Sequence, residues 1–165
     1  MHMRDQRQRR FKVDLSRVER YRFAWQASED GRLHGGLMFS DEHDPVGDAS
    51  APATPALLAA AVGHCLSASL LEALRHAHVD VVGCETEAVS TVAPNADGLP
   101  RIDHLAVVIR PLLATASNRT KRCEEVFERH CTVTSSVRQG IDVRVQVEWR
   151  VAPAAVAVAD ASGSE

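Results

Sequence analysis

Hydrophobic and polar residues follow a helical period in one long segment of this chain. When residues 55–77 are wound at 100° each, leucine, valine and alanine side chains cover one broad side. Pro55 suits the first helical position and Thr54 can cap it. The narrower polar side holds Cys65, Ser69, Glu72 and His76. We therefore expect a long central helix with a thiol at the edge of its buried face.

Alternation with a period of two predicts a first hairpin before this helix. From Val18 onward, Tyr21, Phe23 and Trp25 alternate with polar residues, which is typical of a half-buried strand. A turn at residues 29–31 follows, and residues 33–39 return as a second strand. Residues 40–53 are rich in Asp, Pro and Gly and predict an irregular loop that leads into the helix.

The second half of the chain predicts another hairpin, two helices and a last strand. Residues 79–93 and 102–113 are β-branched and separated by a strong turn signal at residues 94–98. Helical spacing covers residues 118–131, and the hydroxyl-rich run from Thr132 predicts a short helix that ends near Gly140. Residues 141–151 alternate without a fault and predict a strand.

This order of elements indicates an α+β fold with antiparallel sheet packed on helices. We expect one domain over residues 11–151, preceded by a flexible basic arm at residues 1–10 and followed by a flexible tail at residues 152–165. The central helix is apolar enough to need cover on most sides, and a partner subunit can supply it.

Composition narrows the function classes. The formal net charge of −3 and the 4% aromatic content argue against a nucleic-acid partner. Polar residues interrupt the central helix, so we expect no membrane span and a soluble, cytoplasmic protein. The acidic residues between Asp41 and Asp48 are read as solvated turns rather than a metal site, and no cofactor is expected.

Cysteine spacing leaves several possibilities open. The four cysteines are widely spaced without a C-x-x-C pair, which argues against a disulfide scaffold or a zinc ribbon. Cys84, inside a predicted strand, is most simply a small core residue. Cys65 has polar neighbours, so it can be either a reactive thiol or a packing residue.

Two segments together resemble the OsmC/Ohr family of osmotically induced and organic hydroperoxide resistance proteins. The first is LLAAAVGHCLSASL, residues 57–70, which looks like the family's helix with the peroxidatic cysteine. The second is FERHCTVTSSVRQGI, residues 127–141, which is similar to the family's second-cysteine segment. The resemblance covers roughly residues 23–151 and implies an OsmC-like fold.

The resemblance also implies an intertwined homodimer with two active sites at its interface. By position, Cys65 would attack a peroxide and become a sulfenic acid, and Cys131 would resolve it as a disulfide. A small organic hydroperoxide would be the substrate, and a thiol reductant of dithiol or lipoyl type would restore the thiols.

Attack on a peroxide needs a thiolate, and this chain departs from the family in the groups that stabilise one. Family members carry a glutamate ten residues before the cysteine, where this chain has Pro55, and an arginine in the preceding loop. No Lys or Arg occurs between Arg32 and Arg75. Cys131 is expected at a helix N-terminus, whereas Cys65 is mid-helix, and Glu72 would raise its pKa. The candidate substitutes for the cation are Arg22, Arg32 and His64.

Three functions are compatible with these residues. The leading hypothesis is thiol-dependent reduction of organic hydroperoxides by Cys65 and Cys131. The alternative is a non-peroxidatic protein of the same fold that binds a small apolar ligand at the dimer interface. A third hypothesis treats all four cysteines as packing residues.

Overall fold

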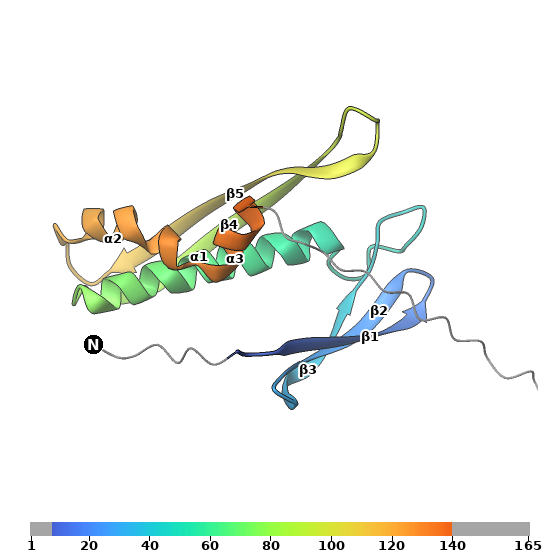
Figure 1. The fold of residues 1–165 in the computed structure, drawn as a ribbon, viewed down its shortest axis with the longest axis horizontal. Helices are drawn as coiled ribbons and strands as arrows, with labels where there is room; N and C mark the ends of the chain where they lie inside the picture. Colours follow the sequence, from blue (N-terminus) through green and yellow to red (C-terminus); the bar gives the residue numbers. More distant parts are fainter. Residues whose placement is uncertain (1–7, 140–165) are drawn as a thin grey trace, which may run out of the picture.

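One long helix, α1 (Thr54–His76), is the axis of the computed structural model, which describes residues 8–139. Figure 1 shows the elements around it. They are β1 (Phe11–Glu19), β2 (Arg22–Glu29), β3 (Arg32–Ser40), β4 (Val81–Pro94), β5 (Pro100–Leu113), α2 (Thr120–Val126), the 3-10 helix η1 (Phe127–His130) and α3 (Thr132–Gln139). Both sheets are antiparallel, which confirms the predicted α+β class.

Helix α1 has nearly the predicted bounds, but it begins differently. Ala53, not Thr54, is the N-cap, and no side chain caps the first turn. The proline lies within the first two helical positions, where its missing N–H has no intrahelical partner. The predicted apolar side is confirmed, because its side chains are buried or packed against the core. The buried positions are Ala59, Val62, Gly63, Leu66 and Leu74.

By length and composition, α1 could also cross a membrane, which the interrupted sequence pattern did not lead us to expect. It is the one such helix in the part of the chain that the structure describes. The core helix of a soluble protein meets the same criterion. Here β4 packs along α1, and the ion-paired residues Glu72 and Arg75 lie near its end.

The β4–β5 hairpin covers one side of α1 and confirms the second predicted hairpin (Figure 1). Its turn is held by the Asn95 side chain, which accepts hydrogen bonds of 3.0 Å from the backbone N–H groups of Asp97 and Leu99. The helix packs closely on β4 at Gly63. A Cβ atom there would lie 2.9 Å from the Cβ of Ala88, so glycine allows the contact.

The N-terminal sheet has three strands: β2 and β3 confirm the predicted hairpin, but its first strand begins at Arg22 rather than near Val18, and β1 was not predicted. Strand β1 ends at Glu19, and Tyr21 lies in the turn before β2 rather than in a strand. The predicted turn before β3 is confirmed: Asp30 and Gly31 have φ angles of 48° and 85°, as in the turns that suit tight hairpins.

The predicted helix over residues 118–131 is also wrong in its extent. It is divided into α2 and η1, and Cys131 has extended backbone with ψ of 103°. Helix α3 begins at Thr132, as predicted, and its last described residue is Gln139. The strand predicted at residues 141–151 and the tail at residues 152–165 lie outside the described residues, as does most of the arm.

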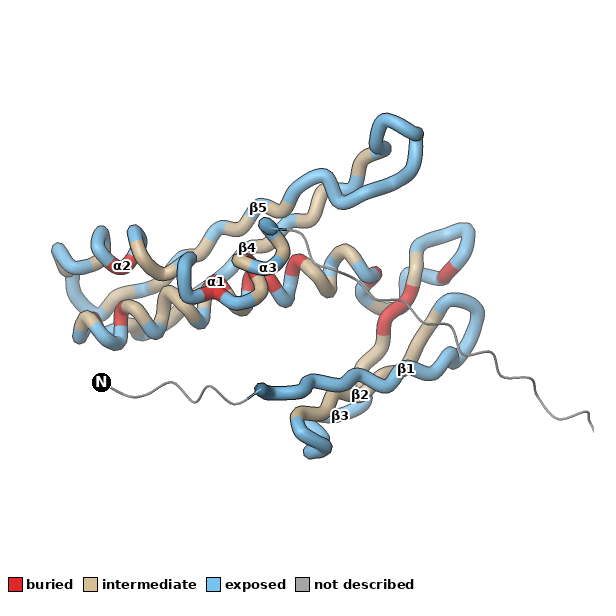
Figure 2. Tube along the Cα trace, in the orientation of Figure 1, coloured by how far each residue is buried: buried red, intermediate tan, exposed pale blue. Residues whose placement is uncertain are grey.

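Two buried clusters hold the helices and the second hairpin together. The first joins Val62 and Leu66 of α1 to Cys131. The second joins Leu74 to Val79 and Cys123. Figure 2 shows buried residues along α1 and in the loop before it, whereas β1 is exposed over its whole length. Cys84 is only partly buried, so it is less of a core residue than expected.

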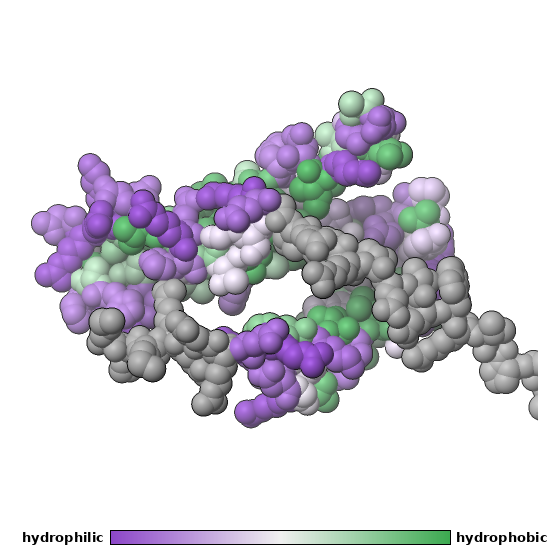
Figure 3. Space-filling view, viewed as in Figure 1, coloured by the Kyte–Doolittle hydropathy of each residue, from purple (hydrophilic) through white to green (hydrophobic). Residues whose placement is uncertain are grey.

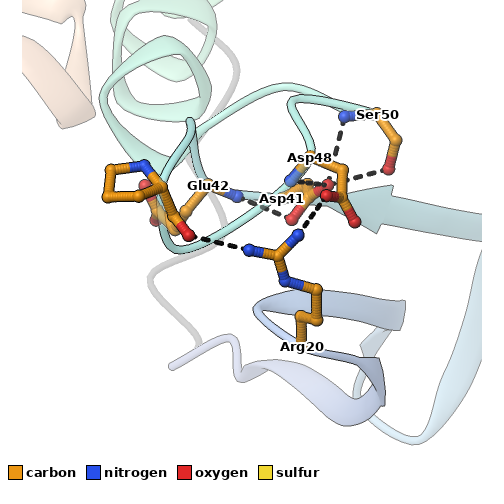
Figure 4. A network of polar contacts seen from close by, with 6 residues as sticks. Arg20, Asp41, Glu42, Asp48 and Ser50 are labelled. Carbon is orange, nitrogen blue, oxygen red and sulfur yellow. Dashed lines mark hydrogen bonds and ion pairs between the residues drawn. The ribbon is translucent and has the colours of Figure 1, made fainter.

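The loop between β3 and α1 is organised by one buried carboxylate, Asp41, which is 2% exposed. Asp41 accepts hydrogen bonds from the backbone N–H groups of Glu42, Asp48 and Ser50 and from the Ser50 hydroxyl, at 2.8–3.3 Å (Figure 4). The Ser50 N–H group contributes most to lowering the pKa of Asp41, against the opposing effect of burial. This network fixes the loop that leads into α1.

Arg20 fastens the same loop to the turn between β1 and β2. Its guanidinium is ion-paired with Asp48 and donates a 2.7 Å hydrogen bond to the carbonyl oxygen of Pro45 (Figure 4). Gly47 is required here because a Cβ atom would lie 2.1 Å from the carbonyl oxygen of Glu42. The N-terminal sheet is thereby tied to the start of α1.

Candidate functional site

The structure brings Cys65 and Cys131 together, although 65 positions separate them in sequence. Cys65 lies in the middle of α1, and Cys131 immediately precedes α3, which packs on α1. Cys131 belongs to the first core cluster and Cys65 packs against it, and each thiol influences the pKa of the other. All four cysteines of the chain are free thiols in the structure.

Cys131 caps the N-terminus of α3 with its sulfur. The backbone N–H of Thr134 donates to the Cys131 Sγ at 3.4 Å, and the Thr134 hydroxyl oxygen lies 3.0 Å from the same atom. This is the geometry in which an N-cap side chain accepts from the third residue of a helix. The expectation that Cys131 meets a helix N-terminus is confirmed.

Cys65 faces this helix N-terminus as well, which its position in the middle of α1 did not indicate. Val133 packs against the same core cluster as Cys65, and the backbone N–H groups of Val133 and Thr134 act to lower the pKa of the Cys65 thiol. Unpaired N–H groups in the first turn of a helix carry a partial positive charge and stabilise an anion. The first turn of α3 thus serves both sulfurs.

The two thiols differ in acidity. Burial raises the pKa of Cys65, and the hydrogen bond with Cys131 raises it further, against the lowering effect of the Val133 and Thr134 N–H groups. Burial also acts to raise the pKa of Cys131, but hydrogen bonds from Cys65 and from Thr134 outweigh it and lower the pKa.

The exposure of the two thiols differs in the opposite sense to their acidity, because the thiol with the lowered pKa is the more buried one. Cys131 is completely buried, with 0% of its surface exposed. Cys65 is partly exposed and lines a groove between α1 and the α2–η1 segment, with a volume of about 800 Å³. The walls of the groove are mostly apolar and include Ala68, Ala73 and Val126, while His130 lies among the polar lining residues. A solute can therefore approach Cys65 from the groove.

Arg22, Arg32 and His64, the expected substitutes for the family's arginine, do not account for the pKa of Cys65. Arg22 stacks on the Phe39 ring at 4.6 Å in the N-terminal sheet, and Arg32 lies at the start of β3. His64 is exposed on α1. The leading influences on the Cys65 pKa are burial, Cys131 and the α3 N–H groups, with no arginine, lysine or histidine among them.

Glu72 lines the groove but does not act on Cys65 as expected from the sequence. Arg75 donates to its carboxylate at 2.7 and 2.8 Å, and His76 lies 2.9 Å away. The Arg75 hydrogen bonds, with the nearby His76, lower the pKa of Glu72 to about 2. This carboxylate is not among the leading influences on the pKa of Cys65.

Two functional features were missed by sequence reasoning. Thr134 was recognised only as a possible helix-capping hydroxyl, and its proximity to Cys131 follows from the turn before α3. Cys123 lines the same groove as Cys65, and its thiol donates to the Ala73 carbonyl oxygen at 3.5 Å. Among the described residues, no cluster of three or more histidine, cysteine or acidic side chains could hold a metal ion.

Comparison with solved structures gives several matches of the same fold. An OsmC-like protein from Vibrio cholerae is 13% identical, with a TM-score of 0.60, 79% of this chain and 93% of that chain being covered. An OsmC-like protein from Mycoplasma pneumoniae is 12% identical, with a TM-score of 0.60, and the match covers 82% of this chain and 90% of that chain. An organic hydroperoxide resistance protein from Elizabethkingia anophelis is 12% identical, with a TM-score of 0.56, and the match covers 82% of this chain and 91% of that chain.

No curated protein sequence matches the chain. The family model for OsmC-like proteins matches residues 47–146, a segment that begins in the loop before α1 and includes both Cys65 and Cys131. This match covers more than half of the chain and agrees with the structural neighbours in fold. The chain is a member of the OsmC-like protein family.

Proposed function

We propose that this protein reduces organic hydroperoxides with Cys65 as the peroxidatic thiol and Cys131 as the resolving thiol. The observation that carries the proposal is the contact between a groove-facing thiol and a buried one at a helix N-terminus. Two structural neighbours of low identity are organic hydroperoxide resistance proteins from Legionella pneumophila and Elizabethkingia anophelis.

The roles follow from access rather than from acidity alone. A hydroperoxide in the groove can meet the Cys65 sulfur, whereas Cys131 is enclosed by α1 and α3. Attack on the terminal peroxide oxygen breaks the O–O bond and gives a Cys65 sulfenic acid and an alcohol. Cys131 then forms the disulfide with release of water, and a dithiol reduces it by thiol–disulfide exchange.

The groove supports an organic rather than an inorganic peroxide. Its walls are mostly apolar, and its volume exceeds what hydrogen peroxide needs. Burial of each methylene group of a substrate contributes about 0.8 kcal/mol. Hydrogen peroxide lacks this contribution, so an alkyl or aryl hydroperoxide should react at lower concentration.

We also propose that the functional unit is a homodimer. One face of the N-terminal sheet is apolar: Leu15 pairs with Trp25 and Val13 with Ala27 across β1 and β2. Phe11 and Leu15 on β1 are 70% and 58% exposed. Figure 3 shows this sheet separated from the helices by an open space. An exposed apolar face of this kind is typical of an interaction surface, and a second copy would cover it.

The alternative function has one observation in its favour. Pro55 stands where family members carry the activating glutamate, and burial raises the pKa of Cys65. With a sluggish thiol, the groove could simply bind an apolar ligand. We place either activity in the reducing cytoplasm, where free thiols persist.

Peroxide consumption with a dithiol present separates the two functions. Wild type should consume cumene hydroperoxide, and Cys65→Ser should be inactive. Cys84→Ser is the matched control, because this partly buried cysteine lies on β4 outside the thiol pair, and it should keep wild-type activity. After one equivalent of peroxide, mass spectrometry should find a Cys65–Cys131 disulfide. Equal rates for wild type and Cys65→Ser would refute the peroxidase function.

A further inference from the structure

We propose that Thr134 is a positioning residue for the resolving step, because its hydroxyl holds the Cys131 sulfur in the orientation from which it attacks an oxidised Cys65. This inference rests on the proposed peroxidase function and concerns only its second step, the formation of the disulfide. Thr134 acts through Cys131 and not on the hydroperoxide.

Two hydrogen bonds join Thr134 to the sulfur of Cys131. The Cys131 thiol donates to the Thr134 hydroxyl oxygen at 3.0 Å, and the Thr134 backbone N–H donates to the Cys131 Sγ at 3.4 Å. One rotatable bond places the sulfur of a cysteine, and it has three staggered positions. A residue that accepts from this sulfur and also donates to it selects one of the three.

The backbone of Cys131 is held on both sides. Its N–H donates to the Glu128 carbonyl oxygen at 3.1 Å, and its carbonyl oxygen accepts from the Ser135 N–H, also at 3.1 Å. Cys131 is therefore bound both to η1 and to the first turn of α3. With the main chain held, the position of the sulfur depends on the side-chain torsion, which is the freedom that the Thr134 hydroxyl restrains.

The selected position places the sulfur against α1. Cys131 is 0% exposed and lies in a cluster with Val62 and Leu66, against which Cys65 packs. A disulfide has narrow geometric limits, with Cβ atoms about 3.5–4.5 Å apart and a restricted torsion about the S–S bond. A Cys131 sulfur that turned away from α1 would not meet these limits.

Open space adjoins the other side of this cluster. Thr134 lines a cavity of about 450 Å³ between α1, β5, η1 and α3, together with Val62, Leu66 and Val137. Thr134 is only 5% exposed, and a buried hydroxyl needs a hydrogen-bond partner, which Cys131 provides. Without the hydroxyl, the longer bond from the backbone N–H would remain to hold the sulfur, and the cavity would give its neighbours room to shift.

The resolving step balances, and Thr134 is not consumed in it. The Cys131 sulfur attacks the sulfur of the Cys65 sulfenic acid, the S–S bond forms and the S–O bond breaks. The hydroxyl group leaves with the Cys131 proton as water. The Cys131 sulfur is oxidised by one electron and the Cys65 sulfur is reduced by one, so no further oxidant or reductant is needed.

The test measures how the Cys65 sulfenic acid divides between the disulfide and a dimedone adduct in a single turnover. One equivalent of cumene hydroperoxide is added at a fixed, high dimedone concentration, and mass spectrometry quantifies both products. The ratio compares two fates of the same oxidised molecule, so it does not depend on how much of the protein is folded. In Thr134→Val, the ratio of disulfide to adduct should fall about five-fold, the effect of losing one neutral hydrogen bond.

Further variants separate the hydroxyl from the shape of the side chain. Thr134→Ser keeps the hydroxyl and should return the ratio to the wild-type value, whereas Thr134→Ala is a second variant without the hydroxyl and should resemble Thr134→Val. Thr132→Val makes the same chemical change at an exposed position in the same helix turn, and this matched control should behave as wild type. A merely structural role of Thr134 would change urea unfolding without changing the ratio.

The outcomes separate this inference from the function on which it rests. If Thr134→Val and Thr134→Ala give the wild-type ratio, or if Thr134→Ser is as impaired as Thr134→Val, the positioning role is wrong and the peroxidase function stands. If wild-type Cys65 forms neither sulfenic acid nor disulfide with the hydroperoxide, both are wrong. A lowered ratio in the two variants without the hydroxyl, with Thr134→Ser and Thr132→Val at the wild-type value, would support the proposal.

Discussion

Gly63 lies at a tight contact between α1 and β4, and we predict that Gly63→Ala destabilises the protein even though it removes a glycine from a helix. On an exposed helical site, the change from glycine to alanine stabilises by about 1 kcal/mol. Here the new Cβ atom would lie 2.9 Å from the Ala88 Cβ and 3.5 Å from the Thr86 Cγ2. Whether the variant is more or less stable depends on which is larger, the gain in helix propensity or the cost of the close contact with Ala88.

The contact with Ala88 decides how much stability the Gly63→Ala variant loses. Carbon atoms pack best at about 3.5–4.0 Å, so α1 and β4 would have to separate by more than half an ångström. Such overpacking of a core contact costs about 1–3 kcal/mol. The separation would also disturb Ser67, whose hydroxyl donates to the Gly63 carbonyl oxygen and lies 2.6 Å from the Thr86 hydroxyl. We expect a net loss of about 0–2 kcal/mol, with 1 kcal/mol as the central value.

Denaturant unfolding of four proteins tests this reasoning: wild type, Gly63→Ala, Ala88→Gly and the double variant. Because Ala88→Gly removes the clashing atom, the double variant should recover about 1–3 kcal/mol relative to the sum of the single changes. Ala60→Gly, at an exposed position of α1, calibrates the helix propensity term. If Gly63→Ala stabilises by as much as Ala60→Gly destabilises, and the two changes are additive, the close contact is not a real constraint.

Three other predictions concern the loop, the core and the sheet. Because the pKa of Asp41 is lowered in the folded protein, its ionised form stabilises the fold above the unfolded pKa, and this stability is lost as pH falls through the folded pKa. Asp41→Asn should therefore lower Tm at pH 7. In a series of thermal melts, the difference in Tm between wild type and variant should shrink toward pH 3. Leu74→Ala, in the second core cluster, should cost about 2–5 kcal/mol in urea unfolding, and a smaller loss would mean that the site collapses around the change. Leu15→Asp, on the exposed apolar face of β1, should shift light-scattering mass from two chains to one, whereas an unchanged dimer would show that β1 is not in the interface.

Helix α1 and the β4–β5 hairpin could be predicted from sequence because their signals are local. Alanine and leucine at helical spacing define α1 to within one residue at each end. The hairpin follows from β-branched alternation and from Asn95, whose side chain organises the turn. Thr54 was misjudged as N-cap, because an available hydroxyl does not force the backbone to place it there.

The separate strand β1 could not be recognised because its turn has no sequence signal. Arg20 and Tyr21 connect β1 to β2 without glycine, proline, asparagine or aspartate. From Phe11 to Arg17, pairing joins odd-numbered residues to odd-numbered residues, as in Leu15 with Trp25, and the register shifts only next to the turn, where Glu19 pairs with Arg22. The apolar alternation therefore passes through the turn without a change of phase, and two strands resemble one.

The arrangement at the thiols was only partly predictable, for a different reason. That Cys131 precedes a helix can be read from the threonines and serines that follow it. That Cys65 faces the same helix N-terminus depends on how α3 packs against α1, which no local pattern encodes. Comparing the sequence with the family pattern therefore shows that the cation is missing, but it cannot show the N–H groups of Val133 and Thr134.

These N–H groups change how the loss of the family's glutamate at Pro55 should be understood. An arginine held by a glutamate provides a full charge at the end of a flexible side chain. The first turn of α3 provides a smaller, fixed charge, about half a unit, which is directed at the Cys131 sulfur and acts to lower the pKa of the neighbouring Cys65. In a low-dielectric site, a fixed partial charge at hydrogen-bond distance needs no side-chain ordering when the anion forms. A start of α1 without the carboxylate is therefore compatible with a reactive Cys65.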